Sequence, residues 1–443
     1  MRNSNFKVLQ SFKVFGLKKY LFNTSWLILD KALGLLVAFI VGVYVARYLG
    51  VYKFGQFNYA LSIITILSPL SQMGVHNIYI KYLNLNPDRE REITGTVFFI
   101  KLFGVASLLL LVFLISYFFI SEYTTKILLI VMAIGMCFDS FQVISLFFNA
   151  KVKAKYATIS NFSSNILYSI FRSLLIFINS SLMFFAVAFS FQKLAKSCID
   201  IFIYIKKGNS IRKWKFDRVI AKEIFKRGLP LFFSGIAAVL YVRTDQIMLN
   251  SMLGAEAVGN YSIAIRLSEL CFIFPALLGD SLFPALVNSS NKEILKTRFE
   301  GFFTVLLYMG LVMSLLLSLL SPFLINVLYG KEYIDAISAL SVMAWNIMFA
   351  ALGVGAFRWS IMNNITKYEF YRTGLGFCIN VILNLVLIPR MGILGAAISS
   401  LITRFIADFA FDLVFAKTRP LFFLKLRAIY PSGFMKNLKI LIK

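Results

Sequence analysis

The sequence has no long polar segment, and acidic residues, histidine and cysteine are few. Among 443 residues, 20 are Asp or Glu, one is histidine (His76) and four are cysteine (Cys137, Cys198, Cys271 and Cys378). His76 has no His or Cys neighbour at ligand spacing and no cysteines form a CxxC pair, so we expect no metal site and no cofactor. A GxxxxGK[ST] loop is also absent, which excludes transport driven directly by ATP bound to this chain.

What the chain has instead is apolar sequence. It is 59% hydrophobic and 16% aromatic, with a mean hydropathy of +0.79. A soluble domain with such a surface would aggregate, so the composition indicates an all-α integral membrane protein. Lys and Arg number 46, which gives a net charge of +26. In a membrane protein such an excess is typical of cytoplasmic loops and does not indicate a nucleic-acid partner.

Helices that cross a bilayer need roughly 20 apolar residues. On this criterion the sequence predicts about twelve spans, with bounds good to a few residues. They are 26–46, 57–80, 95–119, 126–149, 156–178, 182–205, 228–252, 258–287, 302–329, 336–362, 368–389 and 393–416. The first run lacks a small-residue cleavage site, so we expect a retained span, preceded by an amphipathic segment over 1–23 that lies on the inner leaflet.

Basic residues are distributed unevenly between alternate connections. The N-terminus, the even-numbered connections and the tail hold 31 Lys and Arg, whereas the odd-numbered connections hold no more than five. This asymmetry predicts that both termini are cytoplasmic. The longest internal connection, 206–227, has nine basic residues and divides six spans from six. The predicted organisation is a six-helix lobe over 1–205, a linker over 206–227, a second lobe over 228–416 and a tail over 417–443.

Two short segments repeat at a distance of 204 residues. Residues 49–60, LGVYKFGQFNYA, and 253–264, LGAEAVGNYSIA, share the pattern LG-x4-G-x-[FY]-x2-A, and each follows the first span of its half. Six crossings separate them, so both halves insert with the same polarity, which predicts two parallel lobes around a central cavity. We expect the glycines at 50, 55, 254 and 259 to permit tight turns.

Charged residues inside the spans are the candidate functional residues, because each one is costly in a bilayer. Three pairs have the spacing of an ion pair on one helix: Arg266 with Glu269, Lys196 with Asp200 and Arg404 with Asp408. Arg358 and Arg372 lie near helix ends and are expected to snorkel. The cations without an evident local partner are Lys101, Arg172, Lys193 and Arg243.

Arg243 and Asp245 are two residues apart on a helix, so they must face different ways. A central cavity lined by cations suits an anionic substrate, in particular a pyrophosphate, because Lys and Arg donate charge-assisted hydrogen bonds to phosphate oxygens. A carboxylate such as Asp245 or Glu269 is a candidate for coupling transport to a proton or sodium ion.

The two parallel halves, the repeated turn, the stretch RTDQIML from Arg243 and the closing stretch NLVLIPRMGILGAA from Asn384 resemble the Wzx-type polysaccharide flippases. This family is related to the multidrug and toxic-compound exporters and to the lipid II flippase MurJ. The resemblance implies a chain that is not an enzyme and that moves an undecaprenyl-pyrophosphate-linked oligosaccharide, such as an O-antigen repeat unit, across the bacterial inner membrane by alternating access. It also implies membrane lipid, a polysaccharide polymerase and a chain-length regulator as partners.

The lipid II flippase holds pyrophosphate with basic residues on its first, second and eighth helices. Lys31, beside Asp30, and Arg266 resemble that set in placement, whereas the second span here has no basic residue before Lys81. The predicted head-group site therefore comprises Lys31, Lys101, Arg172, Lys193, Arg243, Arg266 and Arg404, and the predicted ion-coupling residues are Asp30, Asp245 and Glu269.

Two other functions stay open. An ion-coupled drug or metabolite exporter would have the same architecture, with a cavity richer in carboxylates than in cations. A membrane polysaccharide polymerase or ligase is disfavoured, because the outer connections are too short to hold an acceptor.

Overall fold

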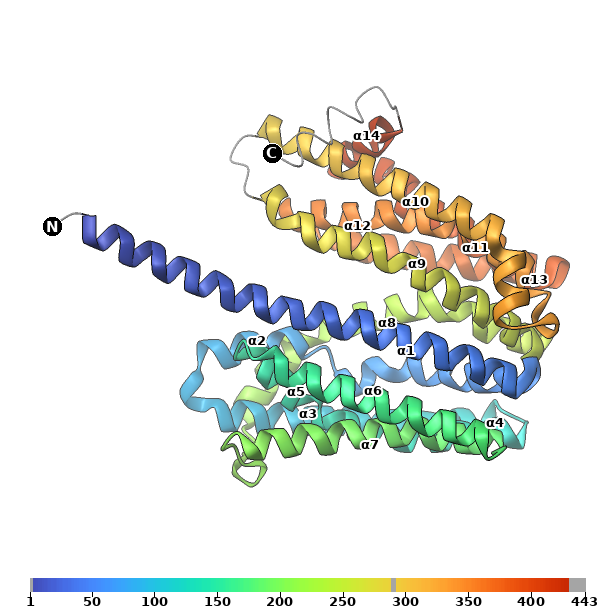
Figure 1. Ribbon diagram of the computed structural model, residues 1–443, viewed down its shortest axis with the longest axis horizontal. Coiled ribbons are helices and arrows are strands. Elements are labelled where there is room, and N and C mark those ends of the chain that lie inside the picture. The colour runs from blue at the N-terminus through green and yellow to red at the C-terminus, as the bar shows by residue number, and fades with distance from the viewer. Residues whose placement is uncertain (1–2, 288–291, 430–443) are drawn as a thin grey trace. The chain divides into compact units, whose positions relative to one another are not determined.

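The computed structural model describes the backbone of residues 3–287 and 292–429 and the side chains of residues 34, 36–283 and 295–429. Within these residues the chain is helical and has no strand. Most of its helices are long and lie roughly parallel within each half of the chain (Figure 1). Residues 3–23 of the predicted amphipathic segment 1–23 lie in helix α1, but the side chains of the segment are outside the described part.

The helices have the following bounds: α1 Asn3–Gln72, α2 His76–Leu85, η1 Pro87–Arg89, α3 Glu90–Phe118, α4 Tyr123–Met136, η2 Cys137–Phe141, α5 Gln142–Ala150, α6 Ala154–Phe177, α7 Leu182–Lys206, η3 Ile211–Lys213, α8 Arg218–Leu253, α9 Ala255–Val287, α10 Lys292–Leu328, η4 Lys331–Tyr333, α11 Ala336–Met343, α12 Asn346–Met362, α13 Lys367–Asp408, η5 Ala410–Leu413 and α14 Arg419–Ala428.

Nine stretches of the described chain are long and apolar enough to cross a membrane. Two of them, Leu36–Leu85 and Lys367–Leu413, each contain one predicted span and most or part of a second. In both, a glycine with non-helical torsion angles, Gly50 or Gly392, interrupts the helix between the predicted spans. Helix α6, which covers the predicted span 156–178, is not among the nine. The all-helical membrane architecture is confirmed, and the count of twelve spans stays a prediction.

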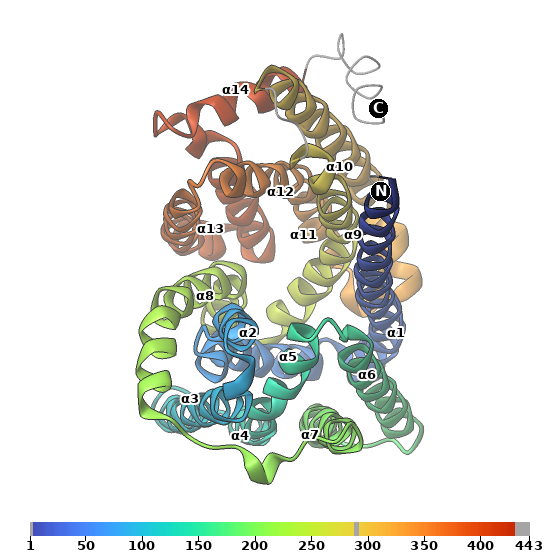
Figure 2. The ribbon, with the colours of Figure 1, turned by 90° about the vertical axis from the view of Figure 1, so that its left-hand side faces the viewer.

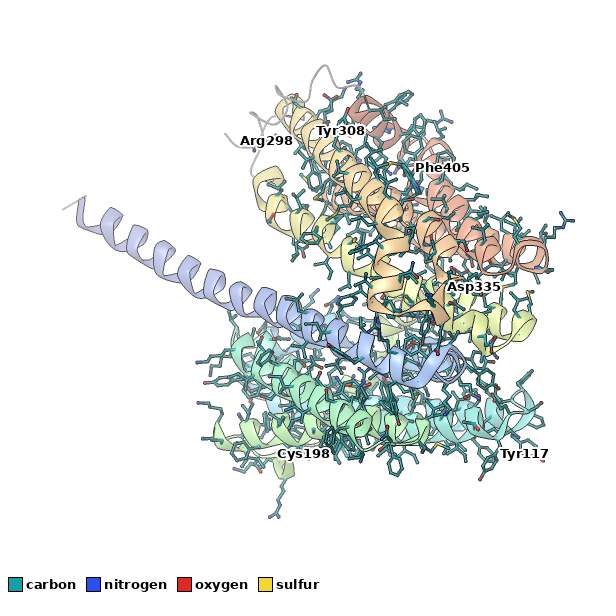
Figure 3. All side chains as sticks on the ribbon, turned by 45° about the vertical axis from the view of Figure 1, so that its right-hand side comes forward. Tyr117, Cys198, Arg298, Tyr308, Asp335 and Phe405 are labelled. Atoms are coloured by element: carbon teal, nitrogen blue, oxygen red, sulfur yellow. The ribbon has the colours of Figure 1, made fainter. Side chains whose placement is uncertain are left out.

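The chain forms two compact units. The first comprises Met1–Tyr48 and Ile63–Ile236, and the second comprises Leu49–Ser62 and Ala237–Lys443. In the first unit α6 lies along α7, as both ribbon views show (Figures 1 and 2). Many apolar side chains of the first unit are exposed, as expected of a surface that faces lipid; Phe113 is one, and Tyr117, labelled in Figure 3, is another.

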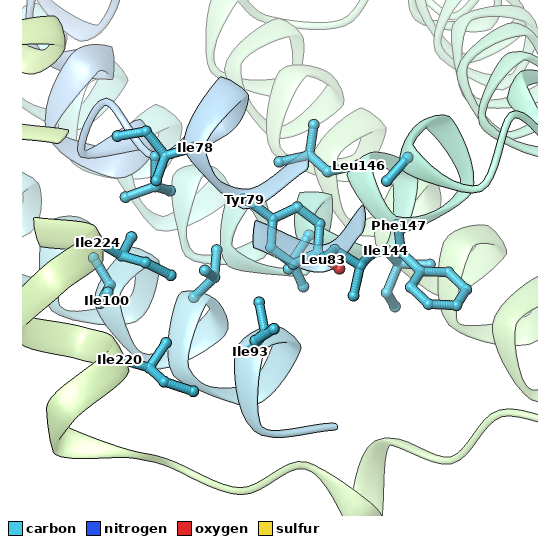
Figure 4. Packing of buried hydrophobic residues seen from close by; sticks show 14 of the residues in the cluster. Ile78, Tyr79, Leu83, Ile93, Ile100, Ile144, Leu146, Phe147, Ile220 and Ile224 are labelled. Carbon is cyan, nitrogen blue, oxygen red and sulfur yellow. The ribbon is translucent and has the colours of Figure 1, made fainter. Parts of the chain in front are cut away.

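The first unit has its hydrophobic core where α2, α3, α5 and the start of α8 meet. Tyr79 lies at the centre of this core, among Leu83, Ile93 and Ile144 (Figure 4). Its hydroxyl is within 3.0 Å of the Thr94 hydroxyl, so the one polar atom of the ring is satisfied inside the core. The second unit has a comparable core between α10, α12 and α14, built around Phe299, Phe302 and Phe303.

The two repeat segments contact each other within the second unit. A Cβ atom on Gly55 would lie 1.8 Å from the carbonyl oxygen of Ala255, and one on Gly259 would lie 2.3 Å from that of Val51. Val51 and Ala255 both occupy the third position of the repeat, so the contact is reciprocal. Backbones approach this closely only where a side chain is absent.

The expected role of the repeat glycines is therefore only half correct. Gly50 and Gly254 have positive φ angles of 68° and 85° and permit the turns. Gly55 and Gly259 lie inside helices, and the prediction that they permit turns is wrong. Their function is close packing, which a spacing rule for turns does not reveal.

Buried charges fasten α14 to the second unit. Asp412 accepts hydrogen bonds from Arg372 Nη2 at 2.7 Å and from Lys425 Nζ at 2.7 Å, and Arg372 also pairs with Glu369 at 2.9 Å. Burial lowers the pKa of Lys425, and Asp412 partly opposes that shift. The expectation that Arg372 snorkels is wrong, because this side chain is buried and reaches a carboxylate 40 residues away.

We predict that Gly55→Ala destabilises the protein by about 1–3 kcal/mol, because the new methyl group forces the two helix backbones apart. Gly374→Ala is the matched control, since no atom lies within 4 Å of a Cβ atom there. This control should be neutral or slightly stabilising, as alanine favours a helix. Thermal unfolding in detergent measures both, and equal stability of the two variants would contradict the close contact.

A second prediction concerns Asp412. Asp412→Ala leaves Arg372 and Lys425 buried without their shared carboxylate, and should cost about 3–5 kcal/mol. Glu300→Ala on the same surface should cost no more than about 1 kcal/mol, because its partner Arg427 is 60% exposed. Denaturant unfolding followed by tyrosine and tryptophan fluorescence compares them. A similar loss in both variants would argue against a special role of the buried network.

Candidate functional site

A cavity of about 120 Å³ lies inside the second unit, between α8, α9, α11, α12 and α13. Its wall is mostly apolar, with a group of polar side chains on one side. Three of the predicted site residues line it, namely Asp245, Glu269 and Arg404. The other polar lining residues are Tyr241, Tyr261, Ser268, Asn346, Asn380 and Ser400.

Asp245 is the central polar group of this cavity. It is 4% exposed and accepts hydrogen bonds from Tyr261 Oη at 2.6 Å, Ser400 Oγ at 2.5 Å and Asn384 Nδ2 at 2.6 Å. These donors come from α9 and α13 and are all neutral. Among the described side chains, Asp245 takes part in no ion pair. A buried carboxylate that has only neutral partners is a candidate binding group for a cation.

Oxygen atoms gather around the carboxylate. Asn384 Nδ2 also donates to Asn380 Oδ1 at 3.0 Å, while the Oδ1 atom of Asn384 is buried and has no hydrogen-bond partner in the described structure. Carboxylate, amide and hydroxyl oxygens are the ligands of hard cations such as sodium. No cluster of three or more His, Cys, Asp or Glu residues occurs in the described chain, so these residues fit an alkali ion or a proton better than a transition metal.

Two arginines near this site, Arg404 and Arg243, have carboxylate partners other than Asp245. Arg404 Nη1 lies 3.2 Å from Asp408 Oδ2, and its guanidinium covers the ring of Tyr241. Arg243 lies 3.6 Å from Glu269 and 3.4 Å from the Gln246 side chain. Arg243 and Asp245 therefore have separate partners, as their spacing predicted. The pair Arg404–Asp408 is confirmed, whereas Glu269 pairs with Arg243 rather than with the residue three positions before it.

Arg266 lies in the second unit near the repeat contact. Its guanidinium is 5.8 Å from the ring centre of Phe54, and Phe54 in turn packs edge-on against Tyr333. Arg266 is not among the residues that line the cavity.

The predicted cations of the first unit lie in a separate polar cluster. Lys193 pairs with Asp139 at 2.9 Å, and Lys196 pairs with Asp200 at 2.9 Å, as predicted for that helix. Lys101 is 1% exposed and donates to Gln142 Oε1 at 3.0 Å. Asp139 lies in the short η2 helix that separates α4 from α5. Lys193 therefore has no carboxylate partner on its own helix, as predicted, but it has one on another helix.

The remaining predicted residues are not in either group. Arg172 on α6 is 6% exposed and covers the ring of Tyr168 at 4.9 Å. Asp30 and Lys31 lie outside the described side chains.

Sequence reasoning missed the residues that hold Asp245. Tyr261 lies within the second repeat segment, and Asn384 opens the closing stretch NLVLIP. Asn380 and Asn384 are four residues apart on α13, and two amides one helical turn apart within an apolar span are a signal that could have indicated a polar site.

Comparison with known proteins identifies the family. Residues 20–290, which are more than half of the chain, match the polysaccharide biosynthesis protein family. The chain belongs to this family. A putative O-antigen transporter of Shigella flexneri is 22% identical over 394 residues, which cover 85% of this chain and 93% of that protein.

Two solved structures share the fold. The lipid II flippase MurJ in an inward closed conformation has a TM-score of 0.71 at 15% identity, covering 95% of this chain and 96% of that one. An inward-facing multidrug transporter of the MATE family has a TM-score of 0.70 at 16% identity, covering 91% and 96%. The predicted family resemblance is confirmed, and the family and fold indicate a multi-pass membrane transporter rather than an enzyme.

We predict different responses to the same substitution at Asp139, which is partly exposed, and at Asp245, which is buried. Asp139→Asn removes the counter-charge of Lys193 and should lower stability by about 1 kcal/mol. Asp245→Asn removes a carboxylate that has only neutral partners, and should leave stability unchanged or raise it at neutral pH and low sodium. Thermal unfolding in detergent measures both. A larger loss for Asp245→Asn would show that the charge itself is stabilised in the folded protein.

Proposed function

We propose that the chain flips an oligosaccharide linked to undecaprenyl pyrophosphate, such as an O-antigen repeat unit, from the cytoplasmic to the outer leaflet of a bacterial inner membrane. The proposal includes twelve spans in two parallel six-helix lobes, cytoplasmic termini and alternating access. It is supported by the family, by the O-antigen relative matched along most of both chains, and by the basic even-numbered connections.

The observation that carries the mechanism is the cavity of the second unit, which is lined by the buried carboxylate of Asp245, by Arg404 and by Glu269, the partner of Arg243. Arg243 has the longest and most exposed of the ion pairs at this site, at 3.6 Å from a glutamate that is 54% exposed. Its guanidinium can exchange that weak pair for a phosphate oxygen at little cost. Within the predicted head-group set, Arg243 is therefore the residue most available to an anionic substrate.

Asp245 is the proposed ion-coupling residue. Its three hydrogen-bond donors are neutral and leave the negative charge of the carboxylate uncompensated, so this charge attracts a cation that reaches the site. Occupancy of this site changes the charge beside Arg404 and Arg243, which links ion binding to substrate binding through electrostatics. Asp30 and Glu269 remain part of the proposed set. A polysaccharide polymerase and a chain-length regulator are the proposed partners.

The test is a flipping assay in proteoliposomes with a defined lipid-linked oligosaccharide. Arg243→Ala should lower the flipping rate by about tenfold or more, because a hydrogen bond to a charged group contributes roughly 1.5–3 kcal/mol. Asp245→Asn should abolish the dependence of flipping on a sodium or proton gradient. The matched controls are Arg390→Ala and Asp335→Asn, both at exposed positions of the second unit.

Both controls should flip like the unaltered protein. Normal flipping by Arg243→Ala and Arg266→Ala, together with normal surface polysaccharide in a complementation assay, would overturn the head-group site. A gradient dependence that survives Asp245→Asn would overturn the coupling role alone.

One observation favours a second function. The cavity has a carboxylate without an ion pair, which is the chemistry expected of an ion-coupled exporter, and the fold is shared with a multidrug transporter. Gradient-driven export of an organic cation by liposomes that do not flip the lipid-linked oligosaccharide would favour this alternative.

A further inference from the structure

The connection between α7 and α8 is packed tightly on the first unit. The Lys215 amide nitrogen donates to Arg91 O at 3.3 Å, and a Cβ atom on Gly95 would lie 2.5 Å from the carbonyl oxygen of Lys215. Trp214 packs against the ring of Phe98, and its Nε1 donates to the Tyr204 hydroxyl at 3.1 Å. This connection is therefore a fixed part of the unit.

Asp217 completes the attachment at the start of α8. Its carboxylate accepts the backbone N–H groups of Ile220 and Val219, and its own amide donates to Thr96 Oγ1. The hydrogen bond from Ile220, followed by that from Val219 and by the charge of Arg89, lowers the pKa of the Asp217 carboxyl. The carboxylate is thus already occupied by the helix terminus and Arg89.

A basic hollow of about 480 Å³ lies beside this connection. Five cations and two carboxylates line it. Arg89 is engaged by Glu92 and Asp217. The other four cations form no ion pair in the described structure; they are Arg91, Arg212, Lys213 and Lys215. The lining therefore has three more cations than carboxylates, an excess that favours a phosphate-bearing anion.

An apolar groove of about 680 Å³ adjoins the hollow. Phe99, Phe103, Phe216 and Phe225 form most of its wall, and Lys222 is the one charged residue among those that line it. Phe103 is 65% exposed and Phe216 is 50% exposed. Phe103 lies on α3 and Phe225 lies on α8, and both helices belong to stretches that are long and apolar enough to cross a membrane. The groove therefore opens at a surface that a bilayer would cover.

The hollow and the groove meet at two consecutive residues. Lys215 lines the hollow and Phe216 lines the groove. Consecutive Cα atoms are about 3.8 Å apart, so a charged group in the hollow and a hydrocarbon chain in the groove can belong to one molecule. A soluble phosphate compound would leave the groove empty, and an apolar peptide would leave the cations without counter-charge.

We propose that this composite site binds one anionic phospholipid of the cytoplasmic leaflet. Its phosphate lies in the hollow against Arg212, Lys213 and Lys215, and one acyl chain lies in the groove along Phe103 and Phe216. Lys222 stands at the groove wall, where it can reach the glycerol-phosphate region. The site belongs to the first unit and does not depend on the cargo or on the ion-coupling site proposed above. Anionic lipid on the cytoplasmic side of a membrane is attracted to such basic clusters.

The experiment is native mass spectrometry of the full-length chain in detergent, titrated with phosphatidylglycerol. The triple variant Arg212→Ser, Lys213→Ser and Lys215→Ser should weaken binding by about tenfold or more, because each basic residue contributes to attraction of an anionic lipid. The matched control neutralises three exposed lysines that line neither the hollow nor the groove, Lys81, Lys153 and Lys206. It should bind like the unaltered chain.

Two further comparisons test the acyl chain and the head group. Phe103→Ala with Phe225→Ala should weaken phosphatidylglycerol binding, whereas Phe113→Ala with Phe202→Ala, which changes two exposed rings outside the groove, should not. Phosphatidylcholine should bind more weakly than phosphatidylglycerol. These substitutions are at exposed positions, and thermal unfolding of every variant verifies that it is folded.

Three outcomes would overturn the proposal. Equal phosphatidylglycerol binding by the triple variant and its control would exclude the hollow. Equal binding of phosphatidylcholine would exclude recognition of the anionic head group. Competition by inorganic phosphate alone, at concentrations similar to those of the lipid, would assign the hollow to a free anion and not to a phospholipid.

Discussion

A charge inside a bilayer must be neutralised close by, and this constraint decides how the few acidic residues are used. Asp139, Asp200, Asp408 and Asp412 each lie against a Lys or Arg. These carboxylates neutralise Lys193, Lys196, Arg404, Arg372 and Lys425. Asp245 departs from this pattern because neutral groups from two other helices surround it. The same rule that makes the other aspartates structural sets Asp245 apart as the proposed ion-coupling residue.

The cationic residues fall into classes of different availability for the same reason. A lysine that reaches a carboxylate at 2.9 Å, such as Lys193, has already recovered much of its cost of burial. Arg243 has not, because its glutamate partner is farther away and largely in solvent. Positive charge in a span is therefore a weak indicator of substrate contact until the position of every carboxylate is known.

The extent to which the sequence predicted the structure follows from the range of the interactions. Spans depend on local hydropathy, and the pairs Lys196–Asp200 and Arg404–Asp408 depend on helical spacing, so both could be predicted. Lys193 and Asp139 are 54 residues apart, and the donors to Asp245 come from two other helices, so neither arrangement has a local signal. The helical membrane fold was predictable, whereas the hydrogen-bond partners of Asp245 were not; the role of Asp245 stays a prediction.

The reciprocal contact of Gly55 and Gly259 has a consequence for how the two halves can diverge. Each glycine accommodates the backbone of the other copy at the same motif position, so each segment is the receptor of its own duplicate. If one of these glycines is replaced by a larger residue, the new side chain meets a backbone carbonyl oxygen of the other segment. A second substitution within the same segment cannot remove that clash. A side chain at position 55 or 259 would therefore force the two backbones apart at the same place in the repeat.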